Sequence, residues 1–314
     1  MSRVVRFDRY GGPEVLELHE VPTPDPGPGE VLVEVRAAGV NPVDWKVRKG
    51  FRSSGALEAP RGLGSDAAGV VAGIGEGVDG VTVGDEVVVR GADGAYASHV
   101  VVTPAQLAPK PATLSWEEAA GLGVPAGTAH QVLTSLGLAE GETLLVHGGS
   151  GGVGQAAIQL ARAKGAAVVA TASAVNLERL RELGALAVEH GPGLVERIRT
   201  AAPDGIDRVL DAAGTDEAIE ASLALVPDRS RIATIVRVEE AEAFGIRAWS
   251  GSRAGRLSDD ERRLRAEAIG VISALAAEGR YEVEIAASYP LERIGDAHAH
   301  SESGHVRGKI VVIP

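Results

Sequence analysis

The residues TLLVHGGSGGVG, from Thr143 to Gly154, give the strongest indication of the fold. A short apolar strand leads into glycines Gly149, Gly151 and Gly154 with the spacing G-x-G-x-x-G, and a helix is predicted over Gly152–Lys164. The first two glycines would permit a tight turn and a close backbone approach to a ligand, and the third would let the helix pack on the strand. The helix N-terminus offers N–H groups and partial positive charge to phosphates. We therefore expect a bound dinucleotide; because the chain contains 41 glycines, a turn without a ligand is the alternative.

Strand and helix patterns alternate after this loop. Further strands are predicted over Ala166–Ala172, Arg208–Gly214, Arg231–Val236 and Gly245–Trp249, and further helices over Leu177–Leu183 and Ser258–Glu278. Upstream, Ser115–Leu138 predicts one or two helices, with Ser115 and Glu118 as a capping box, and Ser258 is the expected cap of the last helix. This alternation is typical of βαβ units that build a parallel sheet.

The first third of the chain has a different pattern. Short β-branched runs cover Val4–Phe7, Val15–His19, Val31–Ala38, Gly69–Ile74, Glu86–Val89 and His99–Thr103. Glycine- and proline-rich segments separate them, which favours an antiparallel, barrel-like domain. The fold class is therefore α/β, with a β-barrel domain and a doubly wound parallel-sheet domain, since 314 residues exceed the usual size of one core.

Composition excludes several classes of function. The chain has 31 basic and 43 acidic residues, a net charge of −12, which argues against nucleic acid as a partner. It contains no cysteine, and so no disulfide, iron–sulfur cluster or thiolate zinc site. The N-terminal residues lack the apolar core of a signal peptide, and no stretch is a convincing membrane span, so we expect a cytoplasmic protein.

The residues after the second strand of the parallel sheet bear on which dinucleotide binds. An NAD-preferring protein normally places Asp or Glu there to hold the ribose hydroxyls, but this chain has Ala172, and its first downstream carboxylate is Glu178. Ser173 can donate a hydrogen bond to a 2′-phosphate, so the pattern favours NADPH. Arg179 is a candidate positive partner; the alternative is an arginine on a solvated helix face.

Several long motifs, in order, extend over nearly the whole chain. They are YGGPEVLEL (Tyr10–Leu18), GVNPVDWKVRKG (Gly39–Gly50), LGSDAAGVVAGIGEGVDGVTVGDEV (Leu63–Val87), GAYASHVVV (Gly94–Val102), LSWEEAAGLGVPAGTAHQVL (Leu114–Leu133), the glycine loop, RVLDAAG (Arg208–Gly214) and SESGHVRGKIVVIP (Ser301–Pro314). With these motifs the chain resembles the zinc-independent quinone oxidoreductases, the zeta-crystallin-like branch of the medium-chain dehydrogenase/reductase superfamily.

The resemblance implies a GroES-like catalytic domain over residues 1–117 and 281–314 and a Rossmann NADP-binding domain over residues 118–280, with the active site in the cleft. It also implies a homodimer or tetramer that pairs through the Rossmann sheet edge, near Gly245–Trp249. Alcohol dehydrogenases of the superfamily bind zinc, but here Gly64-Ser65-Asp66 replaces their GHE-type motif. His298 and His300 form the one close histidine pair, and we expect them on different faces of a helix, at the surface, and not as ligands. We therefore expect no metal.

The resemblance also implies site residues. Asn41 would lie beside the nicotinamide and donate to a developing oxyanion, the alternative being an Asn-Pro turn with Pro42. Lys46 stands where relatives often have tyrosine; it would donate to the acceptor or be a solvated surface lysine. Asp44 would hold the loop. The expected cofactor-binding residues are Asn41, Pro42, Thr128, Gly149, Ser150, Gly151, Gly152, Val153, Ser173, Asn176, His190, Ala213, Gly214, Ile235, Val236 and Lys309. The candidate substrate walls are Trp45, Phe51 and Trp249, for which core packing is an equal alternative.

Without a metal or a strong acid, hydride transfer needs an acceptor that stabilises its own negative charge. We therefore expect NADPH-dependent reduction of a quinone or an activated enone. Two alternatives remain open: a trans-acting enoyl reductase of a biosynthetic pathway, and a non-catalytic relative that binds NADPH. Cofactor consumption would separate the last from the other two.

Overall fold

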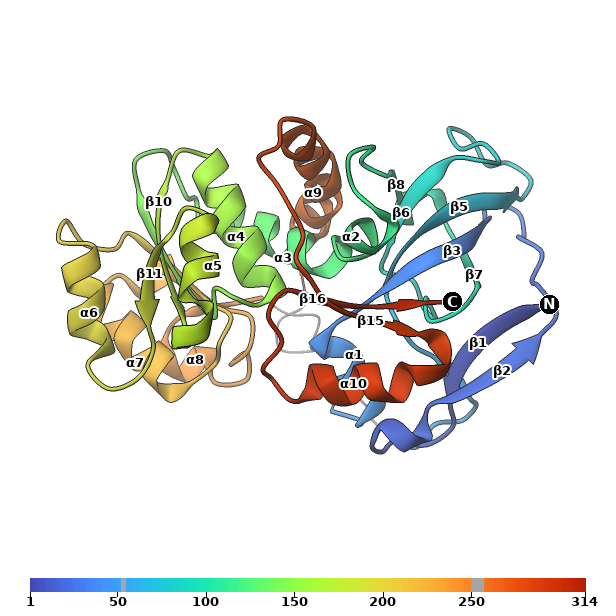
Figure 1. Ribbon diagram of the computed structural model, residues 1–314, viewed down its shortest axis with the longest axis horizontal. Helices are drawn as coiled ribbons and strands as arrows, with labels where there is room; N and C mark the ends of the chain where they lie inside the picture. Colours follow the sequence, from blue (N-terminus) through green and yellow to red (C-terminus); the bar gives the residue numbers. More distant parts are fainter. Residues whose placement is uncertain (52–54, 250–256) are drawn as a thin grey trace. The chain divides into compact units, whose positions relative to one another are not determined.

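The computed structural model describes residues 1–51, 55–249 and 257–314 (Figure 1). The chain packs into two compact units, Met1–Val124 with Ile269–Pro314, and Pro125–Ala268. Both transitions fall inside helices, α3 (Gly123–Ser135) and α9 (Asp259–Ala277), whereas the domain boundaries predicted from the sequence lie at 117/118 and 280/281.

Unit 1 is built on two sheets. The seven-stranded sheet has the order β15 (Ile285–Pro290), β16 (Lys309–Ile313), β3 (Val31–Val40), β5 (Asp66–Ile74), β6 (Glu86–Arg90) and β8 (Leu107–Pro109), with β7 (His99–Val102) also paired to β3. The three-stranded sheet has the order β2 (Glu17–Val21), β1 (Ser2–Phe7) and β4 (Arg61–Gly62). All pairs are antiparallel except β15 with β16. Seven of the ten residues of β3 are valine, alanine or glycine, and the strand is buried along most of its length, so it forms the centre of the barrel-like core.

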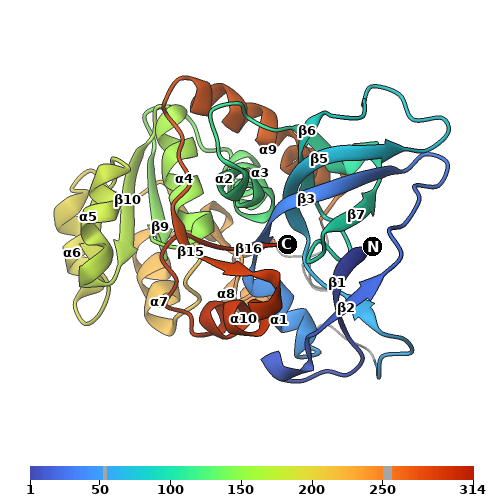
Figure 2. The same cartoon turned by 45° about the vertical axis from the view of Figure 1, so that its right-hand side comes forward.

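Short helices complete unit 1. They are α1 (Pro42–Arg48), α2 (Trp116–Ala120), α10 (Ile294–Glu302), and the 3-10 helices η1 (Pro13–Val15), η2 (Pro104–Gln106) and η5 (Leu291–Arg293). α1 starts directly where β3 ends, because Pro42 fixes the first helical turn and Asp44 accepts the N–H of Asn41. Figures 1 and 2 both show α10 beside α1, so the C-terminal segment supports the helix that follows Asn41.

Unit 2 is a six-stranded parallel sheet. Its order is β11 (Leu186–Glu189), β10 (Ala167–Ala172), β9 (Thr143–His147), β12 (Arg208–Asp211), β13 (Ile232–Thr234) and β14 (Arg247–Ala248). The helices are α3, α4 (Gly152–Ala163), α5 (Leu177–Glu182), α6 (Leu194–Ala201), α7 (Asp216–Leu225), α8 (Ala241–Phe244), the first half of α9, η3 (Ala174–Asn176) and η4 (Arg229–Arg231). The chain runs from β9 outward to β11 and then returns to β12 on the other side of β9. In open α/β sheets, ligands bind outside the carboxyl ends of the strands, at the place where the strand order reverses, which here is beside β9.

The parallel sheet and the barrel-like β unit confirm the predicted fold class. Ser115 with Glu118, and Ser258 with Glu261, form reciprocal capping contacts at the starts of α2 and α9. The elements β11, α6 and α7 were not predicted from the sequence. The strand predicted over Arg208–Gly214 is shorter in the structure, because β12 ends at Asp211.

Candidate functional site

The glycine loop joins β9 to α4 by a turn that needs glycine. Gly148 has a φ of +76°, a conformation that side chains disfavour, and its carbonyl lies where a Cβ on Gly154 would stand, 2.2 Å away. At Gly151 a Cβ would meet nothing closer than 3.7 Å. α4 has no side-chain cap, and within the described chain the N–H groups of Gly152 and Val153 have no acceptor. The loop therefore presents open backbone donors to an anion.

Three of the predicted cofactor residues meet beside this loop. The Asn176 amide lies 3.1 Å from Ser173 Oγ and 3.4 Å from Ser150 Oγ. All three side chains are half-buried; Ser173 and Asn176 follow the end of β10, and Ser150 lies in the glycine loop. His190 follows β11, is exposed, and its N–H donates to the carbonyl of Ala172 at 3.1 Å. The carboxyl ends of β10 and β11 thus gather hydroxyl, amide and imidazole groups, with no carboxylate at Ala172.

Arg179 does not stand on a solvated helix face, as the alternative supposed. Its side chain is only 12% exposed. The guanidinium donates to Gln155 Oε1 at 3.2 and 3.3 Å and pairs with Glu182 at 3.2 Å. Gln155 in turn donates to the carbonyl of Ser150 at 3.0 Å. Arg179 therefore supports the glycine loop indirectly, through Gln155 of α4.

A second group of predicted residues lies on the turns after β12 and β13. Asp211 Oδ1 accepts the N–H groups of Ala213 at 3.0 Å and Gly214 at 2.8 Å. Its Oδ2 accepts the Thr234 hydroxyl at 2.7 Å. Thr234 Oγ1 also accepts the N–H of Val236 at 3.2 Å. Burial raises the pKa of Asp211, which these donors oppose.

The turns at Gly214 and Val236 are thus held by two buried polar side chains, Asp211 and Thr234, which were not among the predicted site residues, and the N–H of Ile235 donates to the backbone carbonyl of Asp211 at 3.0 Å. Ile235 is half-buried and Val236 is exposed. A Cβ on Gly214 would approach Val236 to 2.4 Å, so the two turns pack directly on each other. Thr128 lies in α3 and is buried.

His147, the last residue of β9, is buried, and its Nδ1 lies 3.1 Å from Thr171 Oγ1. Burial lowers the pKa of His147 to about 4, so its ring is neutral near pH 7.

In unit 1, Asn41 is the centre of a buried polar network. Its side chain Nδ2 donates to Asp66 Oδ2 at 2.8 Å, and its Oδ1 accepts from Lys309 Nζ at 2.6 Å. Lys309 also donates to the carbonyl of Val40 at 2.9 Å. Asn41, Asp66 and Lys309 are each at most 4% exposed. Asn41 is therefore more than the start of an Asn-Pro turn: its amide is held at both ends.

Asp44 fixes the backbone of the same residue. One oxygen, Oδ2, accepts the Asn41 N–H at 2.8 Å and the Tyr96 hydroxyl at 2.7 Å. Burial raises the pKa of Asp44 to about 7 and also raises that of Asp66. Burial lowers the pKa of Lys309, against the attraction of the two carboxylates. Asp44 holds the loop, as the resemblance implied.

The predicted substrate residues differ in their exposure and in the unit to which they belong. Trp45 and Phe51 pack edge to face, with ring centroids 6.1 Å apart, and Phe51 is 68% exposed. Lys46 is half-buried, with its ammonium 5.5 Å from the Trp45 ring centroid. Trp249 belongs to unit 2 and is buried; Arg247 covers its ring at 4.4 Å, and its indole N–H donates to Glu261. Trp249 thus fits the core-packing alternative.

The expectation that His298 lies at the surface is wrong. His298 is fully buried, with Nδ1 3.4 Å from Arg48 Nη1 and its ring edge-on to Tyr96 at 5.5 Å. α10 packs against α1 and turns this face inward, which local sequence does not reveal. His300 points elsewhere, to the Tyr289 hydroxyl at 3.1 Å, so the two rings do lie on different faces.

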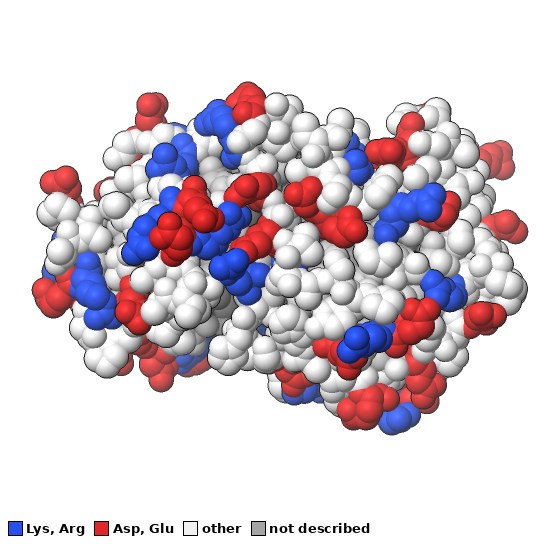
Figure 3. Space-filling model, viewed as in Figure 1, with Lys and Arg blue, Asp and Glu red and all other residues white. Residues whose placement is uncertain are grey.

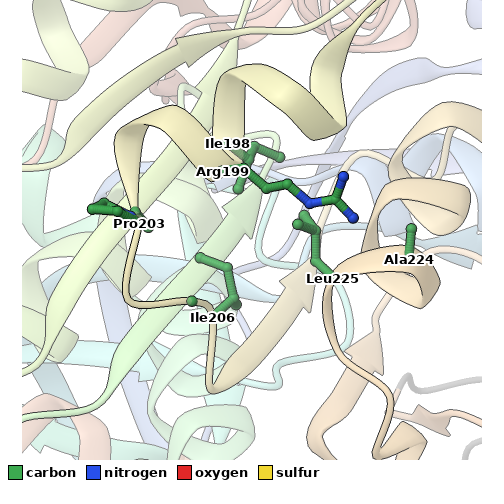
Figure 4. A pocket seen from close by; sticks show the side chains of 8 residues that line it. Ile198, Arg199, Pro203, Ile206, Ala224 and Leu225 are labelled. Atoms are coloured by element: carbon green, nitrogen blue, oxygen red, sulfur yellow. The ribbon is translucent and has the colours of Figure 1, made fainter.

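The structure contains a further hollow, of about 320 Å³, that does not belong to this site (Figure 4). Ile198, Arg199, Pro203, Ile206 and Leu225 line it, beside the loop that precedes β12. It therefore opens at the amino end of the strand, opposite the glycine loop. On the face drawn in Figure 3, basic and acidic side chains lie intermingled. Across the described ranges, every helix is too short or too polar to cross a bilayer.

Comparison with known families accounts for both units. Residues 27–112 match the family described as "Alcohol dehydrogenase GroES-like domain", and residues 183–312 match "Zinc-binding dehydrogenase". The residues present do not fit a zinc ion. The described ranges contain no group of three or more His, Asp or Glu side chains that could hold a metal, and Asp66 is instead bound to an amide and a backbone N–H.

Individual relatives match along almost the full length. The chain is 32% identical to the quinone oxidoreductase of Rattus norvegicus over 330 residues, which covers 99% of this chain and 96% of the relative. It is 30% identical to the chloroplastic NADPH-dependent alkenal/one oxidoreductase of Arabidopsis thaliana, covering 98% and 78%. The crystal structure of Escherichia coli quinone oxidoreductase complexed with NADPH superimposes with a TM-score of 0.85 at 28% identity, covering all of both chains. The chain therefore belongs to the zeta-crystallin-like, quinone oxidoreductase branch of the medium-chain dehydrogenase/reductase superfamily.

Proposed function

We propose that the protein is an NADPH-dependent oxidoreductase that reduces a quinone or an enone without a metal. The observation that carries the proposal is the carboxyl edge of β9 and β10. Open backbone donors of Gly152 and Val153 suit a pyrophosphate, and the cluster of Ser150, Ser173 and Asn176 suits a phosphorylated ribose. The names of the rat and Arabidopsis relatives and of the E. coli complex point the same way.

NADPH, when bound, supplies a hydride, that is, one hydrogen with two electrons. The chain's own residues would hold NADPH: the glycine loop would bind its pyrophosphate, and the turns fixed by Asp211 and Thr234 would contact the rest of the cofactor. Addition of the hydride to a quinone or to the β-carbon of an enone leaves negative charge on the acceptor oxygen. A proton from solvent then completes the reduction. Neither step needs a metal, because the acceptor delocalises the charge.

In unit 1, Asn41 is proposed to donate its amide hydrogen to that oxygen. Trp45 and Phe51 offer aromatic surface to a flat acceptor, and Lys46 beside them offers a further donor. The proposal does not extend to Trp249, which is buried against Arg247 and Glu261.

The proposed assembly is a cytoplasmic homodimer or tetramer that pairs through the edge of the Rossmann sheet. β14 ends the sheet and, among the described residues, has no neighbour on its outer side. Light scattering of the purified protein tests the assembly, and a charged substitution such as A248D at this edge would lower the measured mass if the pairing is right.

The decisive test of the activity is NADPH oxidation with a simple quinone and, separately, with a small enone, in the presence of a chelator. We expect turnover with at least one acceptor, weaker turnover with NADH, and no effect of the chelator. Turnover with the enone alone would favour the enoyl reductase alternative. Tight NADPH binding with no turnover by any acceptor would contradict the proposed activity and favour a non-catalytic relative.

A further inference from the structure

The side-chain amide of Asn41 can be oriented in two ways, and its neighbours decide between them. A lysine ammonium has donors only, whereas a carboxylate is an acceptor when ionised. Lys309 Nζ lies 2.6 Å from one end of the amide, and Asp66 Oδ2 lies 2.8 Å from the other. The reversed amide would set its NH₂ against the ammonium and its oxygen against the carboxylate. Both contacts would then be repulsive, so only one orientation is compatible with the two charges.

The rest of the network holds this arrangement rigid. Asp66 Oδ2 also accepts the N–H of Val124 at 2.8 Å. A Cβ on Gly123 would lie 2.2 Å from Asp66 Oδ1, so only glycine leaves room for this carboxylate. Lys309 is tied to the carbonyl of Val40 as well. A buried ion network of this kind is costly to desolvate, which makes it a weak source of stability and a good candidate for a specificity device.

The orientation determines which hydrogen-bonding group of the Asn41 side chain remains for a substrate. Its Oδ1 is occupied by Lys309, and one of the two Nδ2 hydrogens is occupied by Asp66. One N–H hydrogen remains. It suits an oxygen that gains negative charge, and Asn41 offers no acceptor for the proton that an alcohol must lose.

We infer that Lys309 and Asp66 form a clamp that fixes the Asn41 amide as a hydrogen-bond donor and thereby selects acceptors with a conjugated carbonyl over alcohols. This inference rests on the proposed function and assigns Lys309 a different role from the one the resemblance implied. Lys309 is a positioning residue that acts through Asn41, and not a ligand of the cofactor.

The first test compares the variants K309M and N41A with the unmodified protein. K309M removes the charge and the donors but keeps most of the side-chain length. We expect kcat for the quinone or enone to fall at least tenfold in K309M, while the Kd for NADPH, measured by fluorescence without acceptor, changes less than threefold. In the N41A background, K309M should have little further effect on kcat, because both changes remove the same oriented donor. A tenfold weaker NADPH affinity with unchanged kcat would make Lys309 a cofactor ligand and overturn the inference, and so would independent, multiplicative effects of the two variants.

K110M is the matched control. Lys110 belongs to the same unit, and its side chain is 7% exposed. Its ammonium pairs with Glu86 at 3.2 Å and lies 4.9 Å from the Trp116 ring centroid, and among the described residues it takes no part in the hydrogen bonds of Asn41. Its loss should leave kcat unchanged, which separates the clamp from a general effect of removing a lysine whose side chain is largely buried.

A second readout does not depend on activity. In ¹H–¹⁵N spectra, the side-chain NH₂ signals of Asn41, identified by their loss in N41A, should be slow to exchange in the unmodified protein. They should shift and exchange faster in D66N and in K309M. Slow exchange that persists in both variants would overturn the clamp even if the enzyme turns over. The expected shifts in a protein that reduces no acceptor would support the clamp while the proposed function fails.

Discussion

The carboxylate of Asp211 accepts the hydroxyl of Thr234 at 2.7 Å, which ties the carboxyl end of β12 to that of β13. Each partner also holds a turn, Asp211 through Gly214 and Thr234 through Val236. We expect the near-isosteric variant Thr234→Val to leave the buried carboxylate with one donor fewer and to lower the free energy of unfolding by about 2 kcal/mol. Because the turns would lose their shared anchor, the Kd for NADPH should rise by about tenfold. Urea unfolding and a fluorescence titration measure the two effects.

Thr234→Ser is the control for this pair, since it keeps the hydroxyl and removes only a methyl group. It should restore most of the NADPH affinity. Equal losses of affinity in the serine and valine variants would show that side-chain packing, and not the hydrogen bond, holds the turns.

Two glycines of the loop should respond differently to alanine. In Gly154→Ala the new Cβ would stand 2.2 Å from the carbonyl oxygen of Gly148, so β9 and α4 must move apart. We expect a loss of at least 2 kcal/mol in the free energy of unfolding, about the scale of overpacking a core.

In Gly151→Ala the nearest atom is 3.7 Å away, an ordinary contact, and the fold should be unchanged within about 0.5 kcal/mol. The added methyl group would instead occupy space over the loop and weaken NADPH binding. Thermal unfolding without cofactor, followed by a binding titration, separates the two cases; normal NADPH affinity in Gly151→Ala would place the pyrophosphate elsewhere.

Much of unit 2 could be predicted because its signals are local. The apolar run before the glycines and the spacing of Gly149, Gly151 and Gly154 determine strand, turn and helix within a dozen residues. Short elements such as β11 and α6 carry weak patterns and were missed. The predicted strand wrongly extended to Gly214. The side chain of Asp211 accepts the N–H groups of Ala213 and Gly214, so these groups are not available to the sheet and the chain turns there.

The polar network around Asn41 in unit 1, by contrast, could not be predicted from local sequence. Asn41 was predicted from its motif, but its partner Lys309 lies 268 residues away along the chain, and Asp66 lies 25 away. Nothing local indicates that both contact one amide. The absence of a GHE-type motif identified Asp66 only as a departure from zinc enzymes. The same limit explains His298, whose burial depends on Arg48, 250 residues earlier.

Cofactor preference should respond to charge at the end of β10. Ser173→Asp would place a carboxylate beside Asn176, where Ser173 Oγ now lies 3.1 Å from the amide. It would repel a 2′-phosphate and accept from ribose hydroxyls, so the ratio of kcat/KM for NADPH over NADH should fall at least tenfold, or about 1.4 kcal/mol. Ala174→Asp adds the same charge one residue later at an exposed position, and its ratio should change much less. Similar changes in both variants would mean that net charge, and not this contact, sets the preference.

His298 should make the fold sensitive to acid. Burial lowers its pKa to about 3, with a further contribution from Arg48, whereas in the unfolded chain it titrates near 6.5. Between these values the unfolded state binds one more proton than the folded state, so this residue's contribution to stability is full above pH 6.5 and is lost as the pH falls toward 3. From pH 7 to pH 4.5 the loss amounts to about 2.5 kcal/mol.

The variant His298→Gln tests this prediction, because it keeps an acceptor for Arg48 and does not titrate. Its free energy of unfolding in urea should therefore fall less than that of the unmodified protein over this range, even though Gln lowers the value at pH 7. Asp44, whose raised pKa acts in the opposite direction, is common to both proteins and cancels in the comparison. Parallel pH profiles for the two proteins would show that His298 is protonated in the folded state.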